Sequence, residues 1–439
     1  MMRVVIAALV FAAYAAFAVP ASANPVPAPA IMRYGGATIV QQNDPQSALV
    51  GTELFVRAGL DRQRLAESGL AALVAQAILD TPVRDASGAN VAMHDAVQNS
   101  GGSVTYDVDG HDVRFYLEGL KPAYASRLLP LFQTALAKPD LSEGALRAAR
   151  SEIEQKIAAN QQIALTVGIE MLNGSFYADS GAGLPEYGMA ATLSNLTSAD
   201  AQSFYAAMYR RDGAIVSVAG DAGSVNADAY RGLLNVLPAG SSNPIAYKST
   251  RLEGSSRELR THRDVPAPWL VAQYPAPAAS SSDFGPMLVL TGFMENTLAD
   301  VSELPTVATK SFVDQGVGAL YNFDAQPANL IVYVDGGLGD PSRTFDTALA
   351  VVNVLSGAKL HGSIDQMKAT ATGQFVNGAA TLEDRAWLAG VFAMQNLPPD
   401  YLNRTLAAID GTSIGDLQRV ARKYLRSPAV ALVLPRSMP

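Results

Sequence analysis

The amino-acid sequence predicts an α+β fold of two homologous domains, each a mostly antiparallel sheet covered by helices. Two observations support this prediction: an internal repeat, and a regular succession of strand-like and helix-like segments within each half. The length agrees, because 439 residues fill two or three domains of roughly 100–200 residues each. Hydrophobic residues make up 49% of the chain, which is enough for large cores.

The repeat has an offset of 215 residues. Residues 101–109 (GGSVTYDVD) resemble residues 316–324 (GVGALYNFD). The same offset, 215, places Thr197-Ser198 and Tyr209 on Thr412-Ser413 and Tyr424, at the closing helical pattern of each half. Because one offset recurs at widely separated places, we interpret it as a duplication.

Each half shows the same order of segments. An early strand at 48–56 or 269–274 precedes an apolar helix at 67–79 or 284–294. Two alternating strands follow, at 103–108 and 113–117 or at 319–323 and 330–334. Long helices come next, such as 143–160 and 382–395, and each half ends in an apolar strand, at 214–219 or 429–434. This order predicts two sheets with helices on one side of each.

The start of the chain predicts export. Arg3 precedes an apolar run at 4–19 and the pattern Ala21-x-Ala23, which is typical of a secretory signal peptide at residues 1–23. The compartment that we expect is a bacterial periplasm. Gly, Ser, Asn and Pro cluster at 238–251 and predict a linker, with an N-terminal domain at 24–237 and a C-terminal domain at 252–439.

Composition excludes several functions. The net charge of −8 and the pI near 5.1 disfavour contact with phosphate backbones, so we expect no nucleic-acid partner. The absence of cysteine excludes disulfides, a thiol nucleophile and cysteine-ligated metals. No later stretch reaches 18 uninterrupted apolar residues, so we expect no stable membrane insertion.

The order of segments and the stretch Glu67-Ser68-Gly69-Leu70-Ala71 resemble the insulinase/pitrilysin zinc metallopeptidases, over essentially the whole mature chain. In that family the next residues form the inverted zincin motif His-x-x-Glu-His, in which two histidines bind zinc and the glutamate acts as general base. Here the corresponding positions are Ala72, Ala75 and Gln76. The resemblance therefore implies a degenerate metal site.

The third zinc ligand of the family corresponds to Glu152 in this sequence. A single carboxylate does not hold zinc, because a catalytic zinc site has about three protein ligands. We therefore expect no metal and no other cofactor, with zinc present in active relatives only. In the alternative interpretation, Glu152 is a solvated helix residue. If the alignment is correct, Ala72→His, Ala75→Glu and Gln76→His together should raise metal affinity.

The second half of active family members carries an Arg and a Tyr that resemble an oxyanion clamp. This sequence keeps the tyrosine as Tyr321, a candidate peptide-binding residue, but has Asp314 where Arg is expected. A carboxylate there would repel a developing oxyanion. The alternative interpretation of Tyr321 is a strand residue with its ring in the core and its hydroxyl at the rim.

The histidines offer no replacement site. His94, His111, His262 and His361 are dispersed and have no i, i+4 pairing. His111-Asp112 follows Asp107-x-Asp109-Gly110, which superficially suggests a cation-binding loop but lies where a hairpin turn is expected.

The resemblance also implies a partner. The family's chamber is a clamshell of two bowls, and a chain of this length supplies one bowl, so we expect a homodimer or a heterodimer with a motif-bearing homologous chain. We hypothesise a catalytically inactive scaffold or regulatory partner of an active zinc-peptidase chain. A standalone peptide-binding or assembly protein is the alternative, and an active metallopeptidase is a third hypothesis that the missing ligands disfavour.

Overall fold

The computed structural model describes residues 28–177, 180–242, 258–301, 317–335 and 364–438. The predicted signal peptide at 1–23, most of the predicted linker, and Asp314 lie outside these ranges. In the part of the chain that is described, no helix is long and apolar enough to cross a membrane.

The first half contains eight strands and nine α-helices within its described residues. The strands are β1 (Ala30–Tyr34), β2 (Ala37–Asn43), β3 (Leu49–Val56), β4 (Pro82–Arg84), β5 (Asn90–Ala92), β6 (Gly102–Val108), β7 (Val113–Leu120) and β8 (Ile215–Gly220). The helices are α1 (Leu70–Asp80), α2 (Met93–Asn99), α3 (Lys121–Ala123), α4 (Leu129–Ala137), α5 (Glu143–Asn160), α6 (Ala164–Phe176), α7 (Ala190–Leu193), α8 (Ser198–Met208) and α9 (Ala227–Asn235).

The second half repeats this pattern over fewer described residues. Its strands are β9 (Glu258–Arg263), β10 (Trp269–Pro275), β11 (Val317–Asn322), β12 (Asn329–Asp335) and β13 (Ala429–Pro435). Its helices are α10 (Phe284–Val301), α12 (Ile364–Asn377), α13 (Leu382–Met394), α14 (Tyr401–Asp410) and α15 (Ile414–Tyr424).

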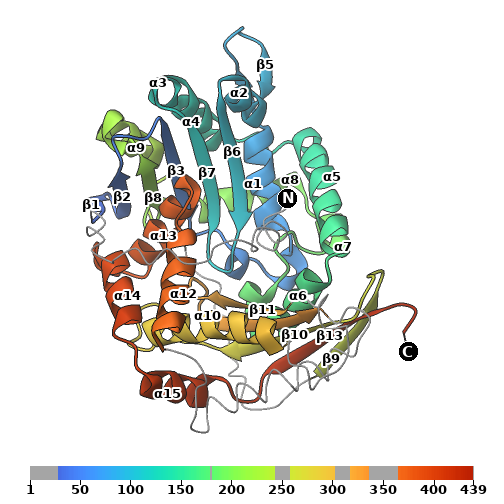
Figure 1. The fold of residues 1–439 in the computed structure, drawn as a ribbon. Coiled ribbons are helices and arrows are strands. Elements are labelled where there is room, and N and C mark those ends of the chain that lie inside the picture. Colours follow the sequence, from blue (N-terminus) through green and yellow to red (C-terminus); the bar gives the residue numbers. More distant parts are fainter. Residues whose placement is uncertain (1–27, 178–179, 243–257, 302–316, 336–363, 439) are drawn as a thin grey trace.

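Two large sheets form the framework of the molecule (Figure 1). The first has the order β1-β2-β8-β3-β7-β6 and the second has the order β11-β12-β10-β13-β9. Read in reverse, the second order matches the first from β2 onward, and each sheet has one parallel pair, β2 with β8 and β9 with β13. The predicted α+β class is confirmed, with two mixed sheets in which antiparallel pairs predominate.

The repeat offset is not constant along the chain. In the hairpins, Gly102 pairs with Gly119 and Val317 pairs with Val334, so the two pairs are separated by 215 residues (317 minus 102). In the closing helices, however, the N-caps are Thr197 and Ser413, which gives 216 (413 minus 197). The sequence match of Thr197-Ser198 with Thr412-Ser413 was therefore wrong by one residue, because the capping side chain and not the letter pattern defines equivalent positions.

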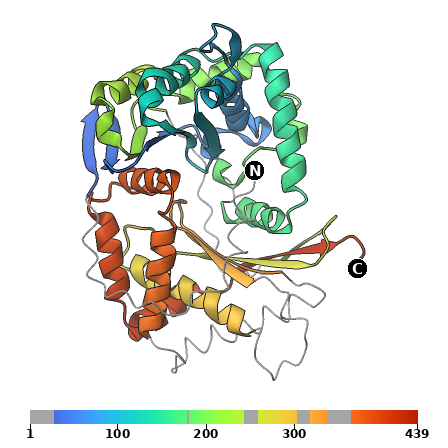
Figure 2. The same ribbon diagram turned by 45° about the horizontal axis from the view of Figure 1, so that its top comes forward.

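The expected placement of helices on one side of each sheet was wrong. Helix α6 of the first half packs on β10 and β13 of the second sheet, and α13 of the second half packs on β2, β3 and β8 of the first. Figure 2 shows α13 lying beneath the first sheet, between the two halves. Each sheet thus has its own helices on one face and a helix from the other half on the opposite face.

Glycines allow this close approach of helix and sheet. A Cβ atom on Gly390 of α13 would lie 2.2 Å from the Phe55 ring in β3, and one on Gly168 of α6 would lie 2.5 Å from Val271 in β10. Any larger side chain would push the helix away from the sheet. The packing of α6 on the second sheet and of α13 on the first sheet therefore requires glycine at these two positions.

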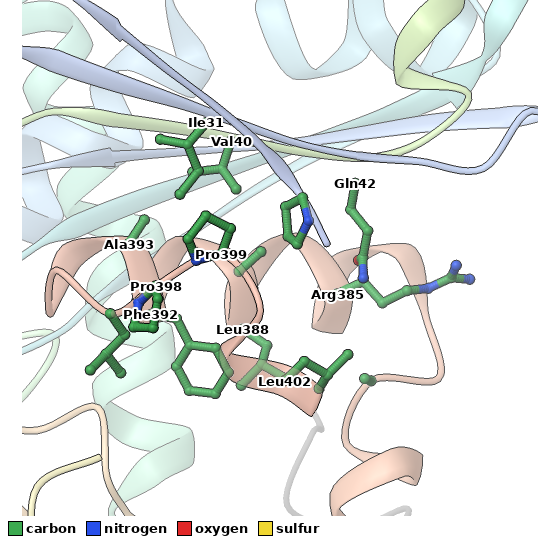
Figure 3. Close-up of a pocket in the computed structure, with 14 residues that line it drawn as sticks. Ile31, Val40, Gln42, Arg385, Leu388, Phe392, Ala393, Pro398, Pro399 and Leu402 are labelled. Carbon is green, nitrogen blue, oxygen red and sulfur yellow. The ribbon is translucent and has the colours of Figure 1, made fainter. Parts of the chain in front are cut away.

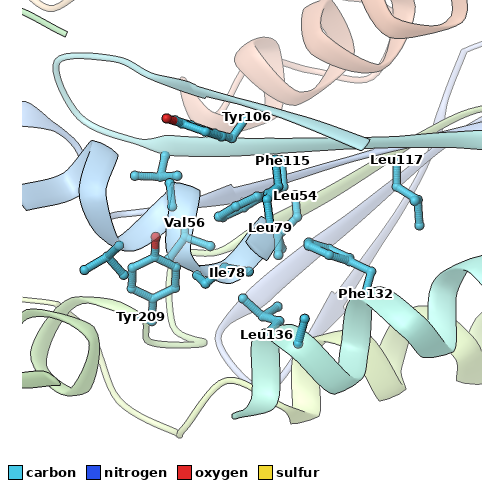
Figure 4. Close-up of a cluster of buried hydrophobic side chains, with 14 of the residues drawn as sticks. Leu54, Val56, Ile78, Leu79, Tyr106, Phe115, Leu117, Phe132, Leu136 and Tyr209 are labelled. Atoms are coloured by element: carbon cyan, nitrogen blue, oxygen red, sulfur yellow. The ribbon is translucent and has the colours of Figure 1, made fainter. Parts of the chain in front are cut away.

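The core of the first half lies between its sheet and the helices on the outer face. Leu54, Phe115 and Phe132 converge there from β3, β7 and α4 (Figure 4). All three are at most 1% exposed. Alternation in β3 sends Leu54 into this core, and its neighbours Glu53 and Phe55 consequently face the second half.

The turns of the two equivalent hairpins meet between the halves. His111 Nε2 donates to the Gln326 carbonyl at 3.2 Å, and these residues are 215 positions apart, so each is the repeat mate of the other. His111 Nδ1 lies 2.7 Å from Asp61. Burial lowers the pKa of His111, but the hydrogen bond to Asp61 and the negative charges of Asp61 and Asp112 together outweigh burial and leave this pKa raised. The predicted hairpin turn at His111 is confirmed.

Candidate functional site

Helices α1 and α5 bring the predicted metal-site positions together. Gln76 and Glu152 line the same cavity of about 390 Å³, which we call the α1–α5 cavity. Its other lining residues are Leu79, His94, Val104, Thr105, Tyr106, Asp107, Lys156, Tyr187 and Glu383. Glu152 is solvent-exposed and Gln76 is buried. The sequence alignment therefore selected two residues that share a site.

Ala72 and Ala75 lie one helical turn apart on α1, and both are fully buried. They belong to the core of the first half. A methyl group carries no metal ligand or proton-transfer group, so these two positions supply no chemistry.

Lys156 occupies the space between the two helices. It follows Glu152 by four residues on α5, so both side chains lie on the same helix face. Its Nζ donates to Gln76 Oε1 at 3.0 Å and to the Tyr106 hydroxyl at 3.1 Å. Burial lowers the pKa of Lys156, while the carboxylate of Glu152 acts in the opposite direction.

The Gln76 amide is satisfied on both sides. Its oxygen accepts from Lys156, and its nitrogen donates to Asp80 Oδ1 at 3.0 Å. Asp80 lies 3.5 Å from His94 Nδ1, and burial raises its pKa. The four side chains form a chain of polar contacts in which both ends of the Gln76 amide have a partner.

These residues do not fit zinc. Gln76 Oε1 is 3.0 Å from an ammonium group, and the remaining motif positions are alanines. Within the described residues, no group of three or more His, Asp or Glu side chains is arranged to hold a metal ion. The cation at this place is the Lys156 ammonium, a feature that the sequence reasoning missed. The sequence pattern that could have indicated it is the lysine four residues after Glu152, the third-ligand position.

The contacts of Tyr321 agree with the alternative interpretation, in which its ring packs in the core and its hydroxyl lies at the rim. Its hydroxyl donates to the Pro277 carbonyl, and its ring lies 5.8 Å from the rings of Phe284 and Phe323. Burial raises the pKa of Tyr321. Its proposed role in peptide binding stays a prediction, and the structure does not place it in the α1–α5 cavity.

A second cavity of about 340 Å³ adjoins the first and shares Asp107 and Glu383 with it. We call it the acidic cavity. Its lining residues come from both halves: Glu53, Asp107, Val108, Asp109, Arg114, Glu186, Asp324, Glu383, Asp384 and Trp387. Sequence reasoning missed it, although a glutamate inside the apolar run 49–56 was an available signal.

An apolar pocket lies between β1, β2 and α13 (Figure 3). Ile31 and Val40 face Leu388 and Phe392 across it. It encloses only about 30 Å³, close to the volume of one water molecule. It is a packing defect at the contact between the halves and does not compete with the two polar cavities as a site.

Lys156 is expected to weaken metal binding by any ligands that are introduced beside it on α1. The triple variant Ala72→His, Ala75→Glu, Gln76→His should bind zinc weakly, because the Lys156 ammonium lies beside the ligands and repels a dication. Adding Lys156→Met should tighten zinc binding by at least about tenfold. The reason is that two unit charges about 4 Å apart near a protein surface interact with about 1–4 kcal/mol, and here that interaction is repulsive.

Zinc titration of both variants measures this effect, and Lys156→Met alone is the matched control. Circular dichroism is needed in parallel, because large side chains at the buried positions Ala72 and Ala75 cost stability. Equal zinc affinity with and without Lys156 would contradict the assigned place of the ammonium.

Solved structures resemble more than nine tenths of the chain. A protease from Helicobacter pylori matches with a TM-score of 0.77 at 16% identity, over 93% of this chain and 100% of that one. The peptidase M16 inactive domain from Pseudomonas fluorescens matches with a TM-score of 0.76 at 15% identity, over 93% and 98%. A chain of complex III2 from Candida albicans with Inz-5 bound matches with a TM-score of 0.72 at 13% identity, over 91% and 94%.

At these identities the likeness establishes the fold. No protein-family model and no curated protein matches the sequence. The resemblance predicted from the order of segments is confirmed at the structural level: over 93% of its length, this chain has the fold of the M16 (pitrilysin-like) peptidases, inactive domains included.

Proposed function

We propose that this protein is a catalytically inactive M16-like chain that acts as a scaffold or regulatory partner of an active zinc-peptidase chain after export to the periplasm. The observation that carries the proposal is the Lys156 ammonium, bound to Gln76 in a peptidase-like fold whose remaining motif positions are Ala72 and Ala75. The predicted signal at residues 1–23 supports the compartment.

Peptide binding by such a chain would use strand β6. This strand lies at the end of the first sheet, and among the described residues it pairs with β7 on one side only. Val104, Thr105, Tyr106 and Asp107 of β6 line the α1–α5 cavity. The unpaired backbone groups of an edge strand can pair with an extended peptide, which gives affinity without requiring a particular side chain.

Hydrogen exchange tests this mode of binding. An unstructured peptide should slow amide exchange in residues 102–108, because new backbone hydrogen bonds protect the free edge of β6. Strand β1, at the opposite end of the same sheet, is an internal control whose exchange should not change. Protection confined to β1, or no protection at all, would contradict peptide binding at β6.

The partner proposal rests on the single-bowl architecture that the fold implies. A chain with two domains forms one bowl of the clamshell and leaves the other side of the chamber open. A second copy of the chain or a homologous chain would close the chamber. The matching chain from Candida albicans is part of a complex, which supports assembly as a use of this fold.

Isolation of the protein tests its inactivity. Purified alone, it should contain substoichiometric zinc and should not cleave unstructured peptides in a chelator-sensitive manner, because the ligand positions are Ala72 and Gln76. Metal analysis and a peptide-cleavage assay with and without chelator measure both. Stoichiometric zinc together with chelator-sensitive turnover would overturn the proposal.

Co-purification separates the two non-catalytic hypotheses. An affinity-tagged copy expressed in its native cell should retain a chain with an intact His-x-x-Glu-His motif, identified by mass spectrometry. If no such chain is retained and β6 still binds peptides, the protein is a standalone peptide-binding protein.

A further inference from the structure

His111 joins the two halves through both nitrogens of its imidazole ring. Its Nδ1 lies 2.7 Å from Asp61 Oδ2, and its Nε2 lies 3.2 Å from the carbonyl oxygen of Gln326. Asp61 belongs to the first half, in the 3-10 turn Leu60–Arg62. Gln326 lies in the second half, in the turn between β11 and β12. One side chain therefore has a partner in each half.

Both contacts require the ring nitrogen to be the donor. A backbone carbonyl oxygen only accepts hydrogen bonds, so Nε2 carries a proton. Asp61 Oδ2 also accepts from the Arg62 guanidinium at 3.0 Å. Between a carboxyl group and an imidazole the proton belongs to the imidazole, which is the stronger base, so Nδ1 carries a proton as well. Neutral imidazole has a single N–H, and the geometry thus specifies a positively charged His111.

The contact with Asp61 is the more firmly held of the two. The backbone amides of residues 59–61 donate to the carbonyl groups of His111, Asp109 and Gly110, so Asp61 is fixed against the same turn as the ring. A ring that loses one proton stays with the carboxylate of Asp61, because a charged acceptor binds an N–H more strongly than a neutral one. The contact that changes is the one with Gln326.

This contact lies at the wall of a cavity of about 320 Å³, which we call the inter-half cavity. Its lining includes Phe55 and His111 from the first half and Asn329 and Val391 from the second. Residues 324–326 of the β11–β12 turn are part of the wall. A shift of this turn away from His111 would therefore widen the cavity.

Charged groups surround the ring on every side. Carboxyl groups on the walls of the inter-half cavity include those of Asp109, Asp112, Glu170, Glu186 and Asp324. Guanidinium groups nearby include those of Arg57, Arg62 and Arg114, which pair with Asp112, Asp61 and Asp109 respectively. These described carboxyl groups outnumber the guanidinium groups, and their negative charge favours the imidazolium form.

The direction of the pH dependence follows from these groups. Because the pKa of His111 is raised above 6.5 in the folded protein, its contribution to stability is fully present below pH 6.5 and is lost as pH rises through the raised pKa. Burial raises the pKa of Asp109 to about 7, although Arg114 acts in the opposite direction. Ionised Asp109 then repels Asp324 of the second half. Both effects weaken the contact between the halves at alkaline pH.

We propose that protonated His111 is a pH-sensitive switch that controls access to the inter-half cavity. At acidic pH the imidazolium binds Asp61 and Gln326 together. Deprotonation leaves the Nε2 lone pair opposite the Gln326 carbonyl oxygen, the two acceptors repel each other, and the turn at 323–328 moves away from the ring. The switch does not depend on peptide binding at β6, so its failure would leave the proposed function intact.

NMR of the imidazole nitrogens tests the charge of the ring. Their chemical shifts distinguish the imidazolium from both neutral tautomers, and His111→Phe identifies the signals of His111 by their loss. Both nitrogens of His111 should be protonated at pH 6, and the ring should release its proton only above pH 6.5. A neutral His111 at pH 6 would overturn the switch.

Distances between spin labels test the movement of the turn. Because the chain has no cysteine, Gln326→Cys and Ala158→Cys, both at exposed positions, direct the labels to one site in each half and keep the backbone carbonyl of residue 326. The distance should increase between pH 6 and pH 9. His111→Arg, which stays charged, should at least halve this increase. His262→Gln, at an exposed position of β9, is the control and should leave the increase unchanged.

Each outcome bears on the role of His111. An equal increase in the natural protein and in His111→Arg would assign the movement to the carboxyl groups and overturn the switch. A constant distance in the natural protein would overturn the opening of the cavity. His111→Phe, which keeps a ring and loses both donors, should show the longer distance already at pH 6, and a short distance there would contradict the proposal. Urea unfolding shows whether each variant is folded.

Discussion

Replacing Glu53 by glutamine is expected to raise the free energy of unfolding by about 3 kcal/mol at pH 7. Burial raises the pKa of Glu53 from 4.5 to about 8, although Arg114 acts in the opposite direction. Each pKa unit corresponds to about 1.4 kcal/mol. The carboxyl group is therefore protonated in the folded protein at a pH where the unfolded chain has lost that proton.

The sign of the pH dependence follows from proton binding. Between pH 4.5 and about pH 8 the folded state holds a proton on Glu53 that the unfolded state has released, so stability falls as pH rises through this window. Below pH 4.5 both states are protonated and the penalty disappears. Glu53→Gln removes this dependence and should leave stability near pH 4 almost unchanged.

Urea unfolding at pH 4, 7 and 8.5 measures the effect as the difference between the variant and the natural protein. The exposed Glu154→Gln is the matched control, because the same chemical change at the surface should have an effect within about 0.5 kcal/mol. A variant that is less stable than the natural protein at pH 7 would show that the ionised Glu53–Arg114 pair contributes more than burial costs.

Replacing Gly390 by valine is expected to destabilise the protein by about 3 kcal/mol through the contact between the two halves. Even a single Cβ atom would lie 2.2 Å from the Phe55 ring, which is 1% exposed and has no room to move. Overpacking of this kind typically costs about 1–3 kcal/mol. Helix α13 would have to move away from the first sheet.

A helix glycine without such a contact is the control. Gly373 of α12 has open space where its Cβ would lie, so Gly373→Ala should stabilise the protein by up to about 1 kcal/mol through helix propensity. Gly390→Val combined with Phe55→Leu should recover part of the stability that Gly390→Val loses, and a double-mutant cycle measures this coupling. Additive effects at the two positions would contradict the direct contact.

Much of the fold could be predicted from local sequence patterns. The segment 143–160 and α5 have the same bounds, and the predicted strand 48–56 differs from β3 by one residue. These elements are defined by side-chain periodicity and by caps such as Ser142, which are local properties. Strands β1, β2 and β9 were missed. Strands β1 and β9 lie at the ends of their sheets and contain exposed polar residues, which weakens the alternation that predicts a strand.

The site could be predicted only in part. The motif alignment identified Gln76 and Glu152, which share a cavity, because the family pattern used for the alignment relates these two helices to each other. It gave no indication of Lys156 as the partner of Gln76, since a contact between residues 80 positions apart depends on how α1 and α5 pack. Glu53 and Asp324 meet in one cavity for the same kind of reason.

The sequence by itself determined the α+β class, the internal repeat and the identity of Ala72, Ala75 and Gln76 at the positions aligned with the metal motif, because periodicity and residue identity are local. Only the tertiary structure decided which helix covers which sheet, that Lys156 lies beside Gln76, and that carboxylates from both halves surround one cavity. Those arrangements depend on packing between segments that are distant in the sequence, such as α1 with α5 and α13 with the first sheet, and no local pattern specifies such packing.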